Sequence, residues 1–222
     1  MKIIGHRGAR GLAPENTLKS IAKALEHGVD EVEIDVRVTA DNVVVLHHDK
    51  DLLDGSRNRL PIKNTSYSEL LRHKNDLAKL EEAIVLISKK VPVHIEIKPG
   101  EPSTAIIKII RKFIKKGWAA NDFLVASYDQ KILLEVHREL PEIVTVVVER
   151  WSSIKATKRA KQLNTKRLSM NQLWLWSYFI KAMSKAGWQL SAYTLNDSAK
   201  AKRWSKLGLY GTITDYPDLF DK

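Results

Sequence analysis

Short apolar runs alternate with amphipathic segments along the whole chain. The runs are rich in β-branched residues and bounded by turn formers, so they predict strands, at 2–5, 31–36, 91–97, 123–127, 143–148, 166–170, 188–194 and 210–214. Between them, apolar residues recur with the helical period of 3.6, over about 17–27, 79–90, 103–116, 129–139, 152–162, 175–186 and 197–207. An extra strand at 42–47 interrupts the second crossover, and a short helical stub follows Pro217.

This alternation predicts an α/β fold. Eight strand–helix units in a chain of 222 residues favour a closed (β/α)8 TIM barrel near its lower size limit. A doubly wound open sheet is the alternative, because the same order of elements also produces it. We find no internal repeat and no linker. We therefore expect a single domain over residues 1–222, with a small irregular insertion at about 49–78.

Polar side chains gather at the carboxyl ends of the predicted strands. In EVEIDV, Glu33 and Asp35 lie two residues apart and so point to one face of a strand. In HIEIKPG, Glu96 and Lys98 share a face in the same way. The carboxyl ends of parallel strands meet at one rim of a barrel. We expect these residues to fall at that rim: His6, Arg7, Glu33, Asp35, His48, Glu96, Lys98, Ser127, Asn196 and Asp215.

The residue types at this rim suit phosphodiester chemistry. Three carboxylates in a chain without cysteine form an oxygen-rich site that favours Mg²⁺ or Ca²⁺ over zinc. Neighbouring His47 and His48 point to opposite sides, so one of them reaches the site; we favour His48 and keep His47 as the alternative. One divalent cation, two histidines and nearby Arg and Lys side chains would suit cleavage of a phosphodiester, because histidine titrates near neutral pH.

The same residues also have structural interpretations. Arg7 would pair with Glu15 in a capped turn. Glu33 and Asp35 would form a buried ion-pair network with Arg37 and Lys98. The cost of desolvating carboxylates for structure alone argues against the second of these.

Further polar and aromatic residues are assigned mainly to structure. Asn196 is as readily a helix cap as a site residue, and we expect Asp215 to serve as a turn and cap residue. An aromatic cluster past the sixth strand is expected to pack into the core, the alternative being an apolar lip for an acyl chain or a lipid surface; it comprises Trp174, Trp176, Tyr178 and Phe179.

Charge and length bound the class of protein. The chain carries 37 Lys and Arg against 26 Asp and Glu, a formal net charge of +11, which favours anionic ligands. The absence of cysteine excludes disulfides and thiol catalysis. The polar motif begins at Gly5, which leaves no room for a signal sequence, and no apolar run approaches the roughly 18 residues that span a bilayer. We expect a cytoplasmic protein.

Six motifs, in order, resemble the glycerophosphodiester phosphodiesterases: HRGARGLAPENT, EIDV, HHD, IEIKP, YTLND and TITDYP. The resemblance implies a TIM barrel that hydrolyses small glycerophosphodiesters to glycerol 3-phosphate and an alcohol, with one divalent cation, Mg²⁺ or Ca²⁺. It also implies that the glycerol hydroxyl next to the phosphate attacks phosphorus first and gives a cyclic phosphate, which water then opens. It assigns Glu33, Asp35 and Glu96 as metal ligands, His6 and His48 as acid and base, and Arg7 and Lys98 as phosphate contacts.

The chain departs from that pattern in places. Tyr193 stands where similar enzymes usually have Trp, and the segment at 49–78 matches poorly. Two alternatives stay open: a lysophospholipase D or phospholipase-C-like lipid phosphodiesterase, and a non-catalytic barrel that binds phosphate or nucleic acid. For the favoured enzyme we expect no nucleic-acid partner. Contact with a membrane surface is compatible with the sequence but not required, and the oligomeric state is left undetermined.

Overall fold

The computed structural model describes residues 1–220, and within them eight parallel strands close into a barrel. The first strand pairs with both the second and the last, which closes the sheet and excludes the doubly wound alternative. The fold is therefore a (β/α)8 TIM barrel in a single domain, as predicted. Its strands are β1 (Lys2–Gly5), β2 (Glu31–Val38), β6 (Val93–Ile97), β7 (Phe123–Ser127), β8 (Val144–Glu149), β9 (Arg167–Asn171), β10 (Gln189–Tyr193) and β11 (Gly211–Thr214).

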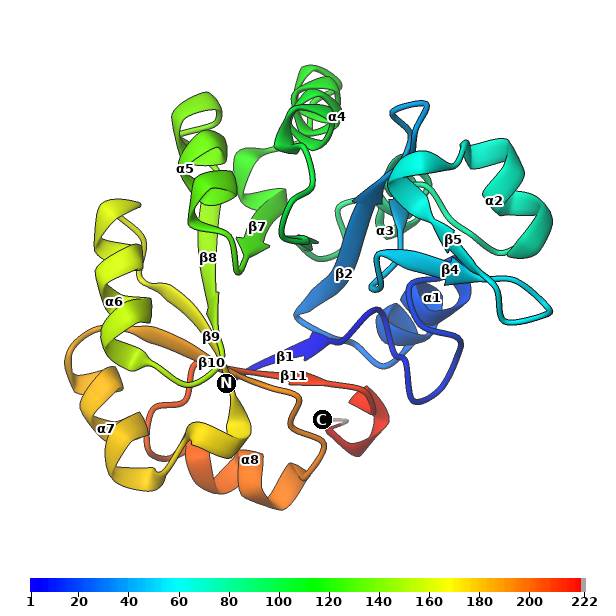
Figure 1. Cartoon of the computed structure of the whole chain (residues 1–222). Coiled ribbons are helices and arrows are strands. Elements are labelled where there is room, and N and C mark those ends of the chain that lie inside the picture. The colour runs from blue at the N-terminus through cyan, green and yellow to red at the C-terminus, as the bar shows by residue number, and fades with distance from the viewer. Residues whose placement is uncertain (221–222) are drawn as a thin grey trace.

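The helices surround the strands (Figure 1). Their apolar faces pack on the outer side of the barrel; α4, for example, buries Ile106, Ile110 and Phe113 while its lysines face outward. No helix in the described part of the chain is long and apolar enough to cross a membrane. The outer helices are α1 (Leu18–Glu26), α3 (Leu80–Ile87), α4 (Ser103–Lys115), α5 (Gln130–Glu139), α6 (Ser153–Gln162), α7 (Ser177–Lys185) and α8 (Ser198–Ser205), and the 3₁₀ turn Pro217–Phe220 follows β11.

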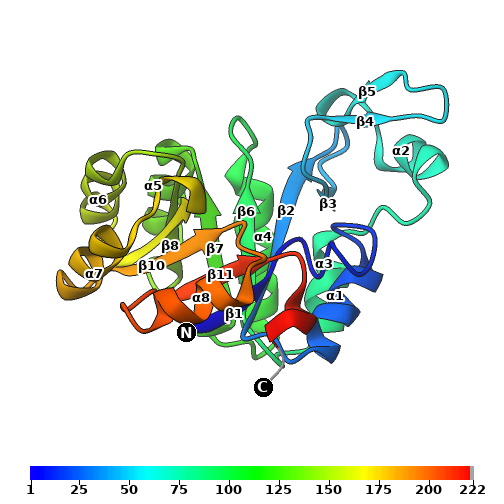
Figure 2. The ribbon, with the colours of Figure 1, turned by 90° about the horizontal axis from the view of Figure 1, so that it is seen from below.

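The segment at 49–78, expected to be irregular, contains regular structure. After β3 (Val44–Leu46), which pairs antiparallel with β2, the chain forms the hairpin β4 (Asp51–Leu53) and β5 (Arg59–Pro61) and then α2 (Tyr67–His73). These elements rise from one end of the barrel (Figure 2). The expectation was wrong because widely spaced apolar residues form a small separate core, which consists of Val45, Leu52, Ile62, Leu70 and Leu77.

The aromatic cluster past the sixth barrel strand does not pack into the core as expected. Trp174, Trp176 and Tyr178 are 50%, 60% and 79% exposed, whereas Phe179 is partly buried. The reason is their position: they lie in the loop after β9 and at the start of α7, where the chain crosses the rim of the barrel.

Alternation along β2 decides which residues face the barrel interior. Val32, Ile34 and Val36 belong to the large core between strands and outer helices. Their neighbours in sequence, including Glu33 and Asp35, therefore point into the barrel.

Candidate active site

Three carboxylates converge at the carboxyl end of the barrel. Asp35 on β2 lies directly opposite Glu96 on β6 in the parallel register, and Glu33 lies two residues before Asp35. One oxygen from each of the three groups lies within 4.8 Å of the others. Glu33 and Asp35 are buried, so these charges are held close together away from bulk water.

Two cations compensate part of this negative charge. Lys98 Nζ lies 2.5 Å from Asp35 Oδ1 and 2.5 Å from Glu96 Oε1. Arg7 Nε lies 3.1 Å from Asp35 Oδ2, but the N–H is not directed at the oxygen, so the contact is an ion pair without an aligned hydrogen bond. Burial alone would raise the pKa of Asp35, yet the charges of Lys98 and Arg7 lower it to about 2. Asp35 is therefore ionised at neutral pH.

Glu33 is compensated far less well. Its Oε2 accepts a hydrogen bond of 2.8 Å from the backbone N–H of Arg7, whereas its buried Oε1 has no hydrogen-bond partner in the described part of the chain. Burial, and then the charges of Asp35 and Glu96, raise the pKa of Glu33 well above its ordinary value. A buried carboxylate oxygen with no partner, beside two further carboxylates, is a donor set that fits a hard divalent cation.

The loop HRGARGLAPENT holds this arrangement from one side. Arg7 and Asn16 both adopt positive φ values, 51° and 55°, which turn the chain back on itself between β1 and α1. Asn16 then forms two hydrogen bonds of 3.0 Å with Asp35, one to the side chain and one from the backbone N–H. Thr17, the next residue, caps α1. Asn16 thus positions Asp35, a role that the sequence pattern did not reveal.

His6, at the end of β1, is held by residues from the far end of the chain. Its Nδ1 lies 2.6 Å from Asp215 Oδ1. Asn196 donates to Asp215 Oδ2 at 3.0 Å and accepts from the Asp215 backbone N–H at 2.9 Å. Although burial opposes it, hydrogen bonds from His6 and Asn196 lower the pKa of Asp215. Asp215 does lie in the bend after β11, as expected of a turn residue, and its side chain also holds His6. Asn196 is not the cap of α8, because Asp197 is.

His48 is oriented by its neighbour. Its Nδ1 lies 2.7 Å from Asp49 Oδ1, and this hydrogen bond lowers the pKa of Asp49. Arg37 donates two hydrogen bonds, of 3.1 and 2.8 Å, to the backbone carbonyl of His48 and so fixes the start of the insertion. His47 points elsewhere, with Nε2 3.4 Å from the carbonyl of Asp51.

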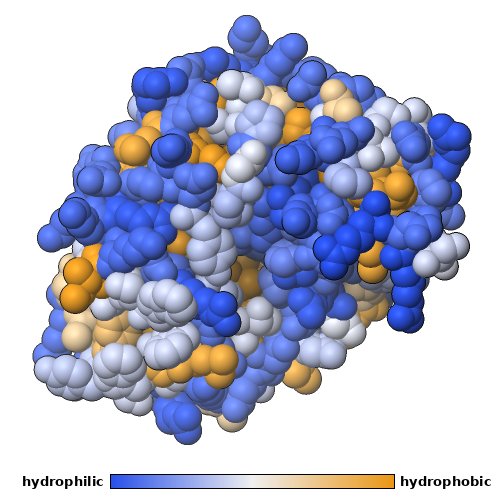
Figure 3. Space-filling view, viewed as in Figure 1, coloured by the Kyte–Doolittle hydropathy of each residue, from blue (hydrophilic) through white to orange (hydrophobic). Residues whose placement is uncertain are grey.

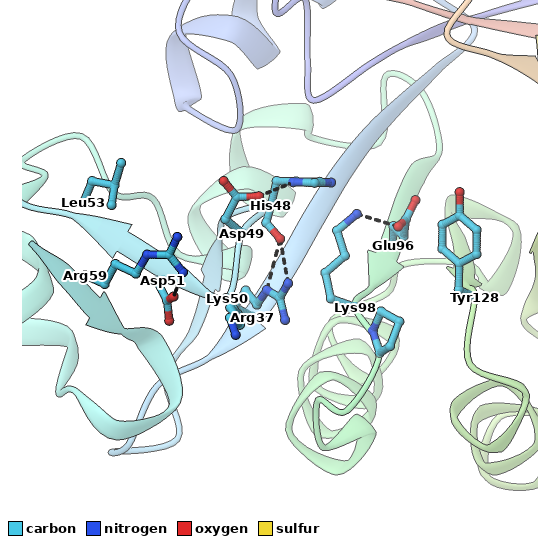
Figure 4. A pocket seen from close by; sticks show the side chains of 11 residues that line it. Arg37, His48, Asp49, Lys50, Asp51, Leu53, Arg59, Glu96, Lys98 and Tyr128 are labelled. Carbon is cyan, nitrogen blue, oxygen red and sulfur yellow. Dashed lines mark hydrogen bonds and ion pairs between the residues drawn. The ribbon is translucent and has the colours of Figure 1, made fainter. Parts of the chain in front are cut away.

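A cavity of about 240 Å³ brings most of these residues together. A second cavity, of about 650 Å³, adjoins it towards the insertion and shares His48, Glu96, Lys98 and Tyr128 with it. In Figure 4 the His48 ring extends from Asp49 towards the Lys98–Glu96 pair, across the mouth from Tyr128. The smaller cavity is lined by His6, Arg7, Arg10, Asp35, His48, Glu96, Lys98, Tyr128, Asn171, Tyr193 and Thr194.

Tyr193 and Tyr128 form one wall of this cavity. Their hydroxyls are hydrogen-bonded to each other, and Tyr193 also donates to the carbonyl of Glu149 at 3.1 Å. Tyr193, which departs from the family pattern, therefore has one partner on β8 and one directly after β7. Neither tyrosine was a predicted site residue, because aromatic residues at strand ends carry no distinctive spacing.

Some structural interpretations hold in part. Arg7 does pair with Glu15, at 2.8 Å, in addition to Asp35. Arg37 is not part of the acidic network, because it pairs with Glu101 at 2.9 Å. Ser127 does not reach the site, since its hydroxyl donates to the carbonyl of Ile97.

The chain was compared with known proteins. The family profile described as "Glycerophosphoryl diester phosphodiesterase family" matches residues 6–219. A glycerophosphodiester phosphodiesterase of Bacillus subtilis is 26% identical over 99% of this chain and 85% of its own length. Human lysophospholipase D GDPD1 is 23% identical over 97% of this chain and 83% of its own.

Solved structures agree with this result. A phosphodiesterase from Oleispira antarctica, in complex with the product sn-glycerol-3-phosphate, superposes with a TM-score of 0.87 at 27% identity. The match covers 100% of this chain and 97% of that one. A family profile that spans almost the whole chain and a matching barrel lead to one conclusion. The chain belongs to the glycerophosphoryl diester phosphodiesterase family and is a phosphoric diester hydrolase.

Proposed function

We propose that this enzyme hydrolyses small glycerophosphodiesters to glycerol 3-phosphate and an alcohol in a metal-dependent reaction with two histidines as acid and base. One observation carries the proposal: the carboxylate trio, two histidines each held by an aspartate, and two cations line or border a single cavity. The product complex of the Oleispira antarctica relative supports the choice of substrate.

Glu33, Asp35 and Glu96 would hold one divalent cation, Mg²⁺ or Ca²⁺. When bound, this cation would supply positive charge next to the phosphoryl oxygens and would lower the pKa of an oxygen ligand. The unpartnered Oε1 of Glu33 supports the assignment, because the ammonium of Lys98 pairs with Asp35 and Glu96 and leaves this oxygen without a partner.

His6 and His48 would exchange protons with the substrate through Nε2. A carboxylate can only accept hydrogen bonds, so Asp215 and Asp49 require that each Nδ1 donates. This tautomer leaves Nε2 of each ring to accept a proton when the ring is neutral and to donate one when it is charged. One ring would deprotonate the attacking glycerol hydroxyl, and the other would protonate the leaving alkoxide. Water would then open the resulting cyclic phosphate to give glycerol 3-phosphate.

Arg7 and Lys98 would bind the phosphate. Both side chains line the small cavity next to the carboxylates, and both carry fixed positive charge. The charges of Glu96 and Asp35 outweigh burial and raise the pKa of Lys98, which keeps its ammonium protonated. Cations held in place before the substrate arrives stabilise the charge that develops on phosphoryl oxygens without further reorganisation.

The test is hydrolysis of glycerophosphocholine with and without EDTA. We expect EDTA to abolish turnover, added Mg²⁺ or Ca²⁺ to restore it, and His6→Ala to lower kcat by about 100- to 10,000-fold. The matched control is His73→Ala, which removes an exposed histidine of α2 outside both cavities. Full turnover in EDTA would exclude the metal-dependent mechanism, and normal turnover of the His6 variant would exclude its role.

The exposed aromatic residues at the rim favour a second candidate, a lysophospholipase D, whose substrate carries an acyl chain. The human relative of that name supports it. Comparing turnover of lysophosphatidylcholine and glycerophosphocholine distinguishes the two, since acceptance of the long-chain substrate alone would overturn our preference. The absence of a nucleic-acid partner and the cytoplasmic location stay predictions.

A further inference from the structure

A group of solvent-exposed apolar side chains lies at the rim of the barrel beside the cavity. The loop between β8 and α6, the loop between β9 and α7, and the first turns of these two helices supply all of them. The most exposed are aliphatic or aromatic: Ile154 at 82%, Tyr178 at 79% and Leu173 at 78%. We call this group the rim patch, and it consists of Trp151, Ile154, Leu173, Trp174, Trp176 and Tyr178.

The rim patch is continuous across the two loops. The rings of Trp151 and Trp174 pack edge to face with centroids 6.5 Å apart, which joins the two loops. Figure 3 shows pale and hydrophobic residues interrupting the hydrophilic surface over α6 and α7. Contiguous exposed apolar surface of this kind usually marks a site of interaction.

The patch borders the entrance to the site. Asn171, which lines the small cavity, caps the 3₁₀ turn that carries Leu173 and Trp174. Trp151 follows two residues after Glu149, whose carbonyl accepts the hydrogen bond of Tyr193. A surface that docks here would therefore lie next to the cavity.

The stretch of chain that carries the patch is basic. Residues 150–196 contain nine Lys and Arg and no Asp or Glu, an imbalance that makes up most of the net charge of +11. Arg150, Lys155, Lys158 and Lys181 from this stretch are exposed. Trp and Tyr are the residues that favour the interface between lipid and water, and cations beside them are drawn to anionic headgroups.

We propose that the rim patch docks onto a bilayer that contains anionic lipids and brings the cavity to the membrane surface. Nucleic acid is the other polyanion that aromatic and basic residues bind, through base stacking. The patch favours a bilayer because Ile154 and Leu173, two of its most exposed members, offer no ring for stacking. The docking follows from the surface alone; its consequence, access to substrates held in the membrane, rests on the proposed function.

The experiment is flotation of the whole protein with vesicles of phosphatidylcholine and phosphatidylglycerol, mixed about 3:1, and with vesicles of phosphatidylcholine alone. We expect binding to the mixed vesicles, and a loss of about tenfold or more in the partition coefficient for Trp174→Ala/Trp176→Ala. The control, Val85→Ala/Leu134→Ala, removes exposed apolar side chains from α3 and α5 and is expected to bind like the wild type.

Charge is tested separately. Lys155→Gln/Lys158→Gln is expected to weaken binding to the mixed vesicles and to make it less sensitive to salt, because electrostatic attraction is screened. Equal binding of wild type and the tryptophan variant would overturn the proposal. Binding of the wild type to an oligonucleotide but not to vesicles would also overturn it. So would dimerisation of the wild type that is lost in the tryptophan variant.

Turnover of glycerophosphocholine in solution distinguishes a failure of membrane docking from a failure of the proposed function. The tryptophan variant is expected to retain it, because neither tryptophan lines a cavity of the site. Vesicle binding without turnover in the wild type would refute the proposed function and leave docking intact. Turnover without vesicle binding would refute docking alone.

Discussion

Two groups of buried charges lie on the inner face of β2, one at each end of the barrel. At the amino end, Arg167 Nη2 lies 3.0 and 2.9 Å from the two oxygens of Glu31, and His94 Nδ1 lies 3.3 Å from Glu31 Oε2. At the carboxyl end, Glu33 has one backbone hydrogen bond and one oxygen without a partner. The two residues are alike in type, strand, face and burial, so their partners alone distinguish them.

The pKa values of the two groups move in opposite directions. Although burial opposes it, the hydrogen bonds and charges of His94 and Arg167 lower the pKa of Glu31. Burial and neighbouring carboxylates raise the pKa of Glu33. Glu31 thus forms a compensated ion pair within the fold. Glu33 lacks a compensating positive charge, which a bound cation would supply. Residues at the carboxyl rim of a TIM barrel serve chemistry, and those at the other end serve stability.

The largest expected effect that separates the two is on catalysis. Glu33→Gln is expected to lower kcat for glycerophosphocholine by about a thousandfold, or about 4 kcal/mol in activation free energy, because the neutral amide is a poor ligand for a divalent cation. The free energy of unfolding of this variant without metal should not fall, because the substitution removes a buried carboxylate that lies beside Asp35 and Glu96. Initial rates at saturating metal measure the first effect and urea unfolding the second; a variant with near-normal kcat would contradict the assignment.

Glu31→Gln is expected to show the reverse pattern. It leaves Arg167 buried with a neutral partner, and breaking a buried pair costs about 3 kcal/mol in the free energy of unfolding. The folded fraction should hydrolyse glycerophosphocholine at close to the wild-type rate. Urea unfolding and single-concentration rate measurements on the same sample check both statements, and a loss of kcat with unchanged stability would reverse our view of the two ends.

The positions of the three acids of the site could be predicted from sequence, because they depend on local order. Alternation along EVEIDV placed Glu33 and Asp35 on one face, and the order of strands placed Glu96 beside them. Asp215 could not be recognised in the same way, since its partner His6 lies 209 residues away and a strand-end aspartate is more often a cap. The sequence does not indicate which carboxylates have a cationic partner. That depends on where the side chains of Arg167 and Lys98 lie in the fold, which residue spacing does not encode.

A divalent cation is expected to raise the free energy of unfolding through Glu33 and not through Glu31. Mg²⁺ or Ca²⁺ at about 100 times its dissociation constant should stabilise the wild type by about 2.7 kcal/mol, because the ion binds only the folded chain. Calorimetric melting with increasing metal would show this as a rise in Tm. The rise should persist in Glu31→Gln and disappear in Glu33→Gln; an equal rise in both variants would place the ion elsewhere.

The smallest effect is the pH dependence of metal-free stability, and its sign differs between the two residues. Glu33 has a raised folded pKa, so the folded state binds more protons than the unfolded one. Stability therefore falls as pH rises from the unfolded pKa, about 4.3, towards the folded value, by at most about 1.4 kcal/mol per pH unit.

Glu31 has a lowered folded pKa, so its contribution is present above about 4.3 and is lost as pH falls towards the folded value. In EDTA, the advantage of Glu33→Gln over the wild type should grow from pH 4.5 upward, whereas the deficit of Glu31→Gln should shrink below pH 4.5, with about the unfolded glutamate pKa as the turning point. Urea unfolding across this range measures both differences. Parallel curves for the two variants would mean that the surroundings of Glu31 and Glu33 do not differ, and the contrast between the ends of the barrel would fail.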